Sequence, residues 1–259
     1  MSKYIFGMFL SLKKLKIYKS NIYIGLFSGA VYLISIFSIW NCIYKEYNNV
    51  AGLDENTIYL YYILSWFVST IVSTKIDREV SDSIKNGEII NDLIKPIDYF
   101  TSKLFNSFGV SLFNFLYKAL PLIIVTFIIM KIKIDKIILL IPFSISIFFG
   151  IIINAEISYL TGVIGFWSIS ARGAIHFKEV IQKNFSGALV PLTFFPDSIQ
   201  KISNILPFDK IIYYPVSILT TRGSYVNCIG IQFSWCFLLF IIIKIVFNNG
   251  INKLTVQGG

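Results

Sequence analysis

STKIDREVSDSIKNGEIINDLIKPID, residues Ser73–Asp98, is a densely charged stretch in a chain that is otherwise strongly apolar. Between residues 75 and 95 it carries five acidic and four basic side chains. The long segments on either side of it hold few charges or none. Charged side chains are costly in the hydrocarbon core of a bilayer. The alternation therefore predicts a membrane protein in which this stretch lies outside the lipid.

The composition of the whole chain supports this prediction. Of its 259 residues, 55% are hydrophobic and 14% are charged, and its mean hydropathy is +0.70. Soluble domains carry about 25% charged residues. The net charge of +9 does not require a nucleic acid, because Lys and Arg accumulate in the cytoplasmic loops of membrane proteins. A single histidine excludes a multi-histidine metal site, and the three cysteines show no paired spacing, so we expect no metal and no nucleic-acid partner.

Uncharged segments indicate where the chain crosses the membrane. A spanning helix needs about 20 apolar residues. We expect spans at about 21–44, 57–74, 104–130, 137–155 and 223–243. The stretch 137–171, in which only Glu156 is charged, is too long for one span and too short for two with a loop. We therefore expect another span to begin near Ile157 and to continue through the polar residues 172–183.

Two further segments differ from ordinary spans. Residues 1–20 hold five lysines, no acid and apolar residues at helical spacing, which predicts an interfacial helix on the anionic cytoplasmic leaflet. The alternative is an ordinary basic flank to the first span. Residues 184–222 carry four of the seven prolines. Because proline interrupts a helix, this segment predicts short, broken helices at the outer surface, including a re-entrant arrangement.

The distribution of basic residues predicts the topology. With the N-terminus in the cytoplasm, the inner segments collect more Lys and Arg than the outer ones, as the positive-inside rule requires. The lysines of residues 131–136 would lie outside, against this trend. The predicted fold class is an all-α integral membrane protein, a single domain over residues 1–259 with six spans and both termini cytoplasmic.

The charged stretch 75–98 has its own internal pattern. Ile76, Val80 and Ile84 form one apolar stripe at helical spacing. Gly87 tolerates the left-handed turn that ends such a helix, and Pro96 stops the short amphipathic piece that follows. The balance of acids and bases argues against docking on anionic lipid and favours a surface held by another protein. The alternative is a solvated connecting loop.

Two groups of residues resemble the signatures of a known family. The first is Ile84, Lys85, Asn86, Gly87 and Glu88, followed by Leu93, Ile94, Lys95 and Pro96. The second comprises Ser186-Gly187, Pro191-Leu192, Phe195-Pro196 and Leu206-Pro207-Phe208. In this order the chain resembles, over nearly its whole length, the permeases of type-2 ABC exporters (the ABC-2 family), in a six-span bacterial subgroup.

The resemblance implies a transporter built from several chains. It implies two permease subunits, identical or related, with two ATPase subunits in the bacterial plasma membrane, and an exporter whose cargo could be a drug, an antimicrobial peptide, a lipid or a glycan. The loop after the second span would hold a coupling helix that docks on the ATPase. The ATPase-coupling residues would be Ile84, Lys85, Gly87, Glu88, Leu93, Lys95 and Pro96. The chain has no Walker A pattern, so ATP and Mg are expected on the partner ATPase and no cofactor is expected here.

Ionisable residues also occur within or beside the predicted spans. Arg172, His176, Glu179 and Lys183 are spaced by 4, 3 and 4 residues and would form one stripe on a helix, while Lys118 interrupts the third span. Such groups usually face a cavity, the bundle interior or a partner. We therefore expect the five to line a translocation path or a permease–permease contact. Alternatively, the stripe lies near the outer headgroups, or is satisfied by His176–Glu179 and Glu179–Lys183 pairs.

Other classes of protein fit less well. An intramembrane enzyme is disfavoured because no nucleophile motif accompanies the single histidine, so the chain itself is not expected to be an enzyme. An ion-gradient-driven secondary transporter remains the alternative. Such chains often contain inverted repeats, and residues 1–130 and 131–259 show no convincing repeat.

Overall fold

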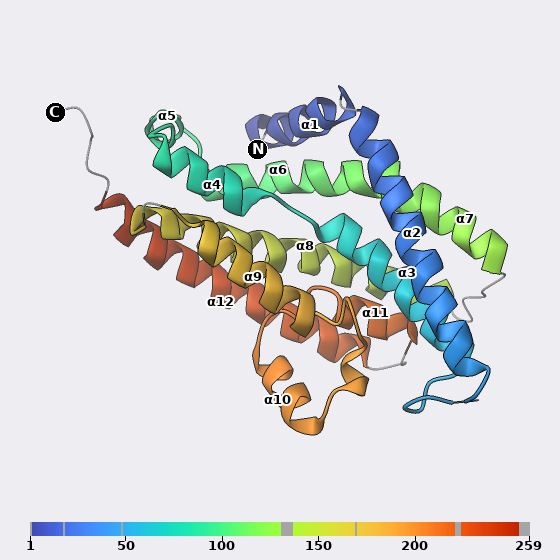
Figure 1. The fold of residues 1–259 in the computed structure, drawn as a ribbon. Helices are drawn as coiled ribbons and strands as arrows, with labels where there is room; N and C mark the ends of the chain where they lie inside the picture. Colours follow the sequence, from blue (N-terminus) through green and yellow to red (C-terminus); the bar gives the residue numbers. More distant parts are fainter. Residues whose placement is uncertain are drawn as a thin grey trace.

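The computed structural model describes residues 2–17, 19–47, 49–130, 137–168, 170–220 and 224–253. Its helices, in chain order (Figure 1), are α1 (Ser2–Ile17), α2 (Lys19–Tyr44), α3 (Glu55–Val72), α4 (Ile76–Lys85), α5 (Ile89–Leu93), α6 (Tyr99–Asn114), the π-helix η1 (Phe115–Ala119), α7 (Leu120–Met130), η2 (Ile137–Leu139), α8 (Leu140–Val163), η3 (Ile164–Phe166), α9 (Arg172–Phe185), η4 (Leu192–Phe194), α10 (Asp197–Ile205), α11 (Tyr213–Thr220) and α12 (Tyr225–Ile251). These described residues contain no β-strand, and the all-α prediction is confirmed.

Five helical segments are long and apolar enough to cross a membrane. They are Lys19–Tyr44, Glu55–Lys85, Tyr99–Met130, Ile137–Phe166 and Tyr225–Ile251. Large apolar side chains on four of them point outward, among them Phe27, Ile128 and Phe237. Contact with lipid requires apolar side chains on the outside and a backbone whose polar groups are hydrogen-bonded internally. These helices meet both requirements. The chain is a multi-pass membrane protein.

The prediction that a new span begins near Ile157 is wrong. Helix α8 continues unbroken through Ile157 to Val163, and η3 extends it to Phe166. The same finding shows that the predicted end of the preceding span at residue 155 is too early. The extra turns are stabilised by packing on α4, where Gly162 and Gly165 allow a close approach of the two helices. Tertiary contact therefore gives this long apolar segment a partner other than lipid.

Helices α8 and α12 run in the same direction, which determines the path of the chain between them. Near their beginnings, Ser146 and Gln232 are hydrogen-bonded at 2.8 Å. Near their ends, the rings of Phe166 and Phe247 lie 5.9 Å apart. The segment between α8 and α12 must therefore return along the molecule, and α9 begins that return (Figure 1).

Helix α9 makes only part of this return. It has 14 residues and is followed by an irregular segment that lies against the middle of α3. Tyr61 donates a hydrogen bond to the carbonyl oxygen of Gly187 at 2.5 Å, and Ser65 donates to that of Ala188 at 3.3 Å. The region from Leu192 onward then forms the short helices η4, α10 and α11.

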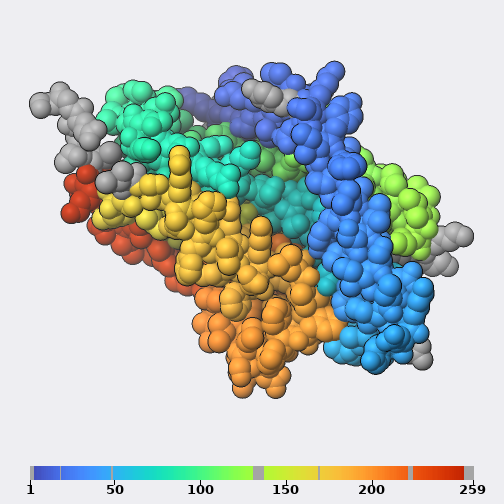
Figure 2. Space-filling view, in the orientation of Figure 1, coloured from blue at the N-terminus to red at the C-terminus, as the bar shows by residue number. Residues whose placement is uncertain are grey.

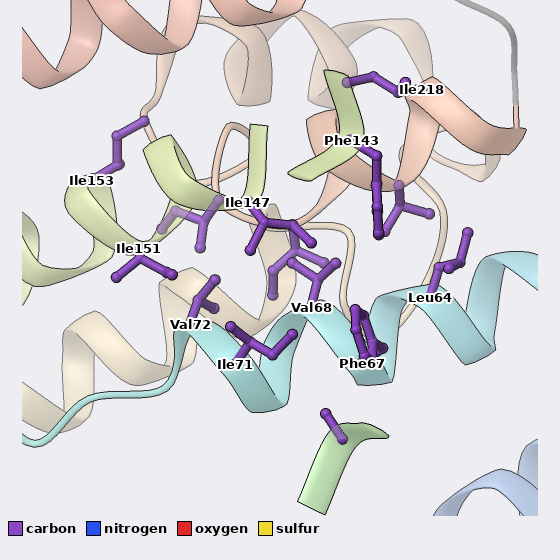
Figure 3. Close-up of a cluster of buried hydrophobic side chains, with 14 of the residues drawn as sticks. Leu64, Phe67, Val68, Ile71, Val72, Phe143, Ile147, Ile151, Ile153 and Ile218 are labelled. Carbon is purple, nitrogen blue, oxygen red and sulfur yellow. The ribbon is translucent and has the colours of Figure 1, made fainter. Parts of the chain in front are cut away.

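The central helix is α3. Its side chains Leu64, Phe67, Val68, Ile71 and Val72 are buried and face α8, as Figure 3 shows. Helix α8 contributes a matching row, and α11 adds Ile218 above it. These are large apolar side chains at helical spacing, and their burial places the main core between α3, α8 and α11.

Helix α1 packs along α6. The Asp98 backbone N–H donates a hydrogen bond to the Tyr4 hydroxyl at 2.9 Å, and the rings of Tyr4 and Phe105 are 5.5 Å apart. The opposite face of α1 exposes Phe6 and Phe9. This exposed apolar face is compatible with the predicted interfacial position, which remains a prediction.

A fully buried ion pair lies between α10 and α11. The Asp209 carboxylate is 2.7 Å from the Lys210 ammonium, and both side chains are 0% exposed. Lys210 also donates to the carbonyl oxygen of Asn204, while Gln232 of α12 donates to the carbonyl oxygen of Lys210, both at 2.7 Å. The Lys210 backbone thus ties the α10–α11 region to α12, while its ammonium binds groups within that region. The lysines of residues 131–136, which the topology prediction places outside the cell, are not among the described residues.

Candidate functional site

A cavity of about 500 Å³ opens between α2, α3, α8 and α9. In Figure 2 this face of the molecule is hollowed between α2 and α9, with α3 behind. Its lining residues are Tyr32, Trp66, Ser69, Val72, Ser73, Thr74, Asp77, Asn154, Lys178, Glu179, Gln182, Lys183, Ser186, Ala188, Leu189 and Ile212. The lining is mixed, with amide and hydroxyl groups beside aromatic and aliphatic ones. A ligand with both polar and apolar parts would fit it.

A nearly buried ion pair forms part of the wall of this cavity. The Lys178 ammonium of α9 donates to the Asp77 carboxylate of α4 at 2.7 Å and to the Ser158 hydroxyl of α8 at 3.1 Å. The side chains of Lys178 and Asp77 are 11% and 3% exposed. A single ammonium therefore joins three helices at the point where α4 meets the membrane helices.

A second ion pair joins the same two helices on a more exposed face. Arg78 donates to the Glu179 carboxylate at 2.8 Å, and the His176 ring lies 3.5 Å from the other oxygen of that carboxylate. The two pairs connect consecutive residues of α4 with consecutive residues of α9. A displacement of α4 would therefore act on α9 through two contacts.

The stripe predicted on α9 is divided between two hollows. Glu179 and Lys183 line the large cavity. Arg172 and His176 instead line a smaller hollow of about 330 Å³ together with residues of α4. The His176–Glu179 pair anticipated as an alternative is present, whereas among the described residues Glu179 pairs with Arg78 and not with Lys183.

Lys118 does not belong to the cavity. It lies in the π-helix η1, and its ammonium is 3.5 Å from the Asn21 side-chain oxygen near the start of α2. Its aliphatic part covers Gly25 on the same helix. The structure therefore places Lys118 in a contact between α2 and the α6–α7 helix, away from Glu179 and Lys183.

The break between α3 and α4 is stabilised by side-chain amides. Asn154 of α8 donates to the carbonyl oxygen of Val72, the last residue of α3, at 2.5 Å. Gln182 of α9 donates in turn to the Asn154 side-chain oxygen at 2.9 Å. On the other side, Asn114 of α6 donates to the Ser73 hydroxyl at 3.0 Å. The Asn154 bond satisfies a backbone carbonyl that the interrupted helix leaves free. The Asn154–Gln182 bond links the break to the cavity wall.

Helix α4 separates its two faces as the sequence predicts. Ile76, Val80 and Ile84 are buried against the ends of α8 and α12. The helix ends at Lys85, and Gly87 follows with a φ of +75° in the left-handed region. The apolar stripe is therefore used within the chain, and the charged face is left for solvent or a partner.

The residues assigned to coupling by resemblance lie together around this turn. Lys85, Glu88, Lys95 and Pro96 are exposed, and Leu93 is half-buried at the end of α5. Lys95 is paired with Asp92 at 2.6 Å. The cluster is thus a charged surface on a helix–turn–helix whose inner side is packed on α8.

Comparison with known proteins decides the family. The family model described as "ABC-2 family transporter protein" matches residues 30–258. The chain belongs to the ABC-2 transporter family. No curated protein and no solved structure matches it. As an ABC-2 membrane subunit the chain is a transport permease, and the ion pairs between α4 and α9 connect its loop after the second span to its cavity.

Two important residues of this ABC-2 permease escaped the sequence analysis. Asp77 is one of the five acids of the charged stretch, and Lys178 lies outside the four-residue stripe predicted for this helix. They are about 100 positions apart in the chain, yet their charged groups are 2.7 Å apart. No local spacing predicts such a pair. The only usable signal is that Lys178 is a charge near apolar segments, where charges are usually paired.

The contact between α4 and α8 gives a first prediction. A Cβ atom at Gly162 would lie 2.7 Å from the carbonyl oxygen of Asp77 and 2.8 Å from the Val80 Cβ. We expect Gly162→Ala to destabilise the permease by about 1–3 kcal/mol, because α4 must move away. Gly230→Ala in α12 is the control, since a Cβ there meets nothing within 4 Å and Ala favours the helix. Thermal unfolding in detergent measures both, and equal midpoints would contradict the prediction.

Proposed function

We propose that this chain is the permease subunit of an ATP-driven exporter, coupled to separate ATPase subunits through the α4–α5 segment. One observation carries the proposal. The Asp77–Lys178 and Arg78–Glu179 pairs join α4, whose outer face is charged, to the helix that forms the cavity wall. A partner that moved α4 would therefore alter the cavity without touching it.

The movement would be that of packed helices shifting as rigid bodies. ATP and Mg would bind only to the partner ATPase. The partner would contact the exposed residues Lys85, Glu88, Lys95 and Pro96 around the turn at Gly87. Asp77 and Arg78 would carry the displacement to α9, where Glu179 and Lys183 line the path and Arg172 and His176 line its junction with α4.

A second permease, identical or related, would complete the translocation path. The cavity is bounded on one side by α2, whose outer face is apolar and exposes Tyr23, Ile24, Phe27, Val31 and Ile34. Such a face can contact lipid or another membrane helix. Transport would proceed outward by alternating access between two such subunits and two ATPases.

We propose six crossings with both termini in the cytoplasm of a bacterial cell. Five are the long apolar segments described above. Helix α9 has 14 residues and is about 21 Å long, which is too short for a bilayer core about 30 Å thick. The sixth crossing would therefore combine α9 with the irregular segment that follows it. Irregular backbone is tolerated at that depth only inside protein, and Ser186 and Gly187 are buried against α3.

One purification tests the function. The tagged chain is expressed with the products of its neighbouring genes, purified in mild detergent and assayed for a bound nucleotide-binding protein and for ATP hydrolysis. We expect an ATPase to copurify and to drive transport in proteoliposomes. Transport driven by an ion gradient alone, with no nucleotide-binding protein bound, would instead establish the secondary transporter.

The turn at Gly87 gives a second prediction. Proline fixes φ near −65°, so Gly87→Pro cannot keep the observed φ of +75°, and Glu88→Lys reverses a charge on the exposed surface. We expect both variants to insert normally but to lose coupling, with ATP-driven transport falling roughly tenfold or more. The assay is transport per ATP hydrolysed.

Matched controls lie at the other end of the molecule. Gly52 has a φ of +80° in the turn between α2 and α3, and Glu46 is exposed in the same turn. Gly52→Pro and Glu46→Lys impose the same changes away from the α4–α5 segment. If these controls uncouple transport as strongly, or if the Gly87 and Glu88 variants transport normally, the ATPase is docked elsewhere.

A further inference from the structure

The charges around the large cavity are not balanced. Four charged side chains line it: Asp77, Lys178, Glu179 and Lys183. Asp77 is neutralised by Lys178 at 2.7 Å, and Glu179 is neutralised by Arg78 at 2.8 Å. Lys183 has no ion pair or hydrogen bond to any part of the chain that the structure describes. The cavity therefore presents one uncompensated positive charge.

The surroundings of that charge are polar on one side and apolar on the other. Asn154 and Gln182 form a hydrogen-bonded pair on the cavity wall. The apolar part comes from three different segments, with Trp66 on α3, Tyr32 on α2 and Leu189 beyond α9. Aromatic and aliphatic groups beside a lone ammonium suit a molecule with an apolar body and one anionic group.

We propose that the cavity binds an anionic amphiphile, with Lys183 contacting its carboxylate or phosphate and the Trp66, Tyr32 and Leu189 side holding its apolar body. The inference rests on the proposed function, because it names the ligand class of that transport path. Its test uses the permease alone, however, and needs no ATPase. If the binding titration fails, the copurification of an ATPase is unaffected. If no ATPase copurifies, the result of the binding titration still stands.

The test is a binding titration of the full-length permease in nanodiscs of phosphatidylcholine. Two dansyl-labelled C11 probes are compared, one ending in a carboxylate and the other in its methyl ester. We expect the carboxylate probe to bind about threefold to fivefold more tightly than the ester to the wild-type chain, since an ion pair with an exposed ammonium contributes up to about this factor. Lys183→Gln should abolish the difference, and Lys183→Arg should retain it.

The net charge of +9 makes a surface control necessary. Lys201 is an exposed lysine on α10 outside the cavity lining. Lys201→Gln removes the same charge and should leave the preference for the carboxylate intact. Equal affinity of the wild-type chain for both probes overturns the proposal. A preference that survives Lys183→Gln, or that Lys201→Gln reduces equally, overturns it as well, because the anion would then bind the basic surface.

The anionic group can belong to a membrane lipid or to a soluble amphiphile. Adding phosphatidylglycerol to the nanodiscs separates the two sources. Competition that depends on Lys183 assigns the cavity to an anionic lipid headgroup. If the carboxylate probe still binds at full affinity in the presence of phosphatidylglycerol, the cavity is assigned to an amphiphile that enters from solution. Because Lys183 is exposed and makes no hydrogen bond or ion pair within the described chain, its replacement should leave helicity and thermal unfolding unchanged, and both are checked.

Discussion

Lys210→Met is expected to cost roughly 3–5 kcal/mol of stability, the largest single effect that we predict. Among the residues that the structure describes, the substitution removes the one cation paired with Asp209, whose carboxylate is completely buried between α10 and α11. It also removes the hydrogen bond from the ammonium to the Asn204 carbonyl oxygen. An uncompensated buried charge costs far more than the pair contributes. Thermal and denaturant unfolding in detergent, followed by circular dichroism, measure the loss.

The effect of Lys210→Met should depend on pH. Burial raises the pKa of Asp209 to about 6, even though the charge and hydrogen bond of Lys210 act to lower it. Removing the ammonium raises that pKa further. A carboxyl whose folded-state pKa lies above its unfolded value favours folding at low pH and loses that contribution as the pH rises through the folded value. The variant should therefore be closest to wild type near pH 5 and weakest near pH 8.

A double variant provides the control. Asp209→Asn combined with Lys210→Met removes both charges and should recover much of the stability, because no buried charge remains. The single variant would contradict the argument if it unfolded at the wild-type midpoint. A double variant less stable than Lys210→Met would also contradict it, since the pair would then act through shape rather than charge.

Asp77→Asn is expected to produce the second large effect, a loss of roughly 3 kcal/mol with impaired coupling. It leaves the Lys178 ammonium nearly buried without its carboxylate, and this ammonium joins α4, α8 and α9. The exchange Asp77→Lys with Lys178→Asp should restore part of both losses, because an opposite pair is formed again. Unfolding midpoints and transport per ATP hydrolysed are measured for all three chains.

The neighbouring pair supplies a matched control. Arg78 and Glu179 connect the same helices at 2.8 Å, but their side chains are 54% and 35% exposed. Exposed ion pairs are worth about 0–1 kcal/mol, so Arg78→Gln should lower the unfolding midpoint only slightly. Equal destabilisation by Arg78→Gln and Asp77→Asn would show that burial does not distinguish the two contacts.

The local pattern of the charged stretch was sufficient to predict α4. Ile76, Val80 and Ile84 form its buried stripe, and Gly87 adopts the left-handed turn. These features follow from residues within one or two helical turns of each other. Local pattern alone led to the wrong prediction that a new span begins near Ile157, because an apolar segment longer than the bilayer is thick was taken to contain two spans. Hydropathy does not indicate that the end of α8 packs on α4.

The candidate site also combines a feature that the sequence predicted with contacts that it could not predict. The helical spacing of Arg172, His176, Glu179 and Lys183 suggested one polar stripe, but α4 lies beside its beginning and divides it between two hollows. Lys178 lies outside that stripe, yet its ammonium pairs with the Asp77 carboxylate of α4. Such partners are chosen by helix packing between segments distant in sequence, and spacing within one helix carries no information about them.

By itself, the sequence determined that this is an all-helical membrane protein with a charged, amphipathic helix followed by a glycine turn. Hydropathy and helical periodicity depend only on neighbouring residues and on the solvent that each segment can tolerate. The tertiary structure alone decided which charges are paired, which is left free in the cavity and how α9 returns along the molecule. Those outcomes depend on the distances between atoms of remote segments, because an ion pair or a cavity exists only after the helices have packed.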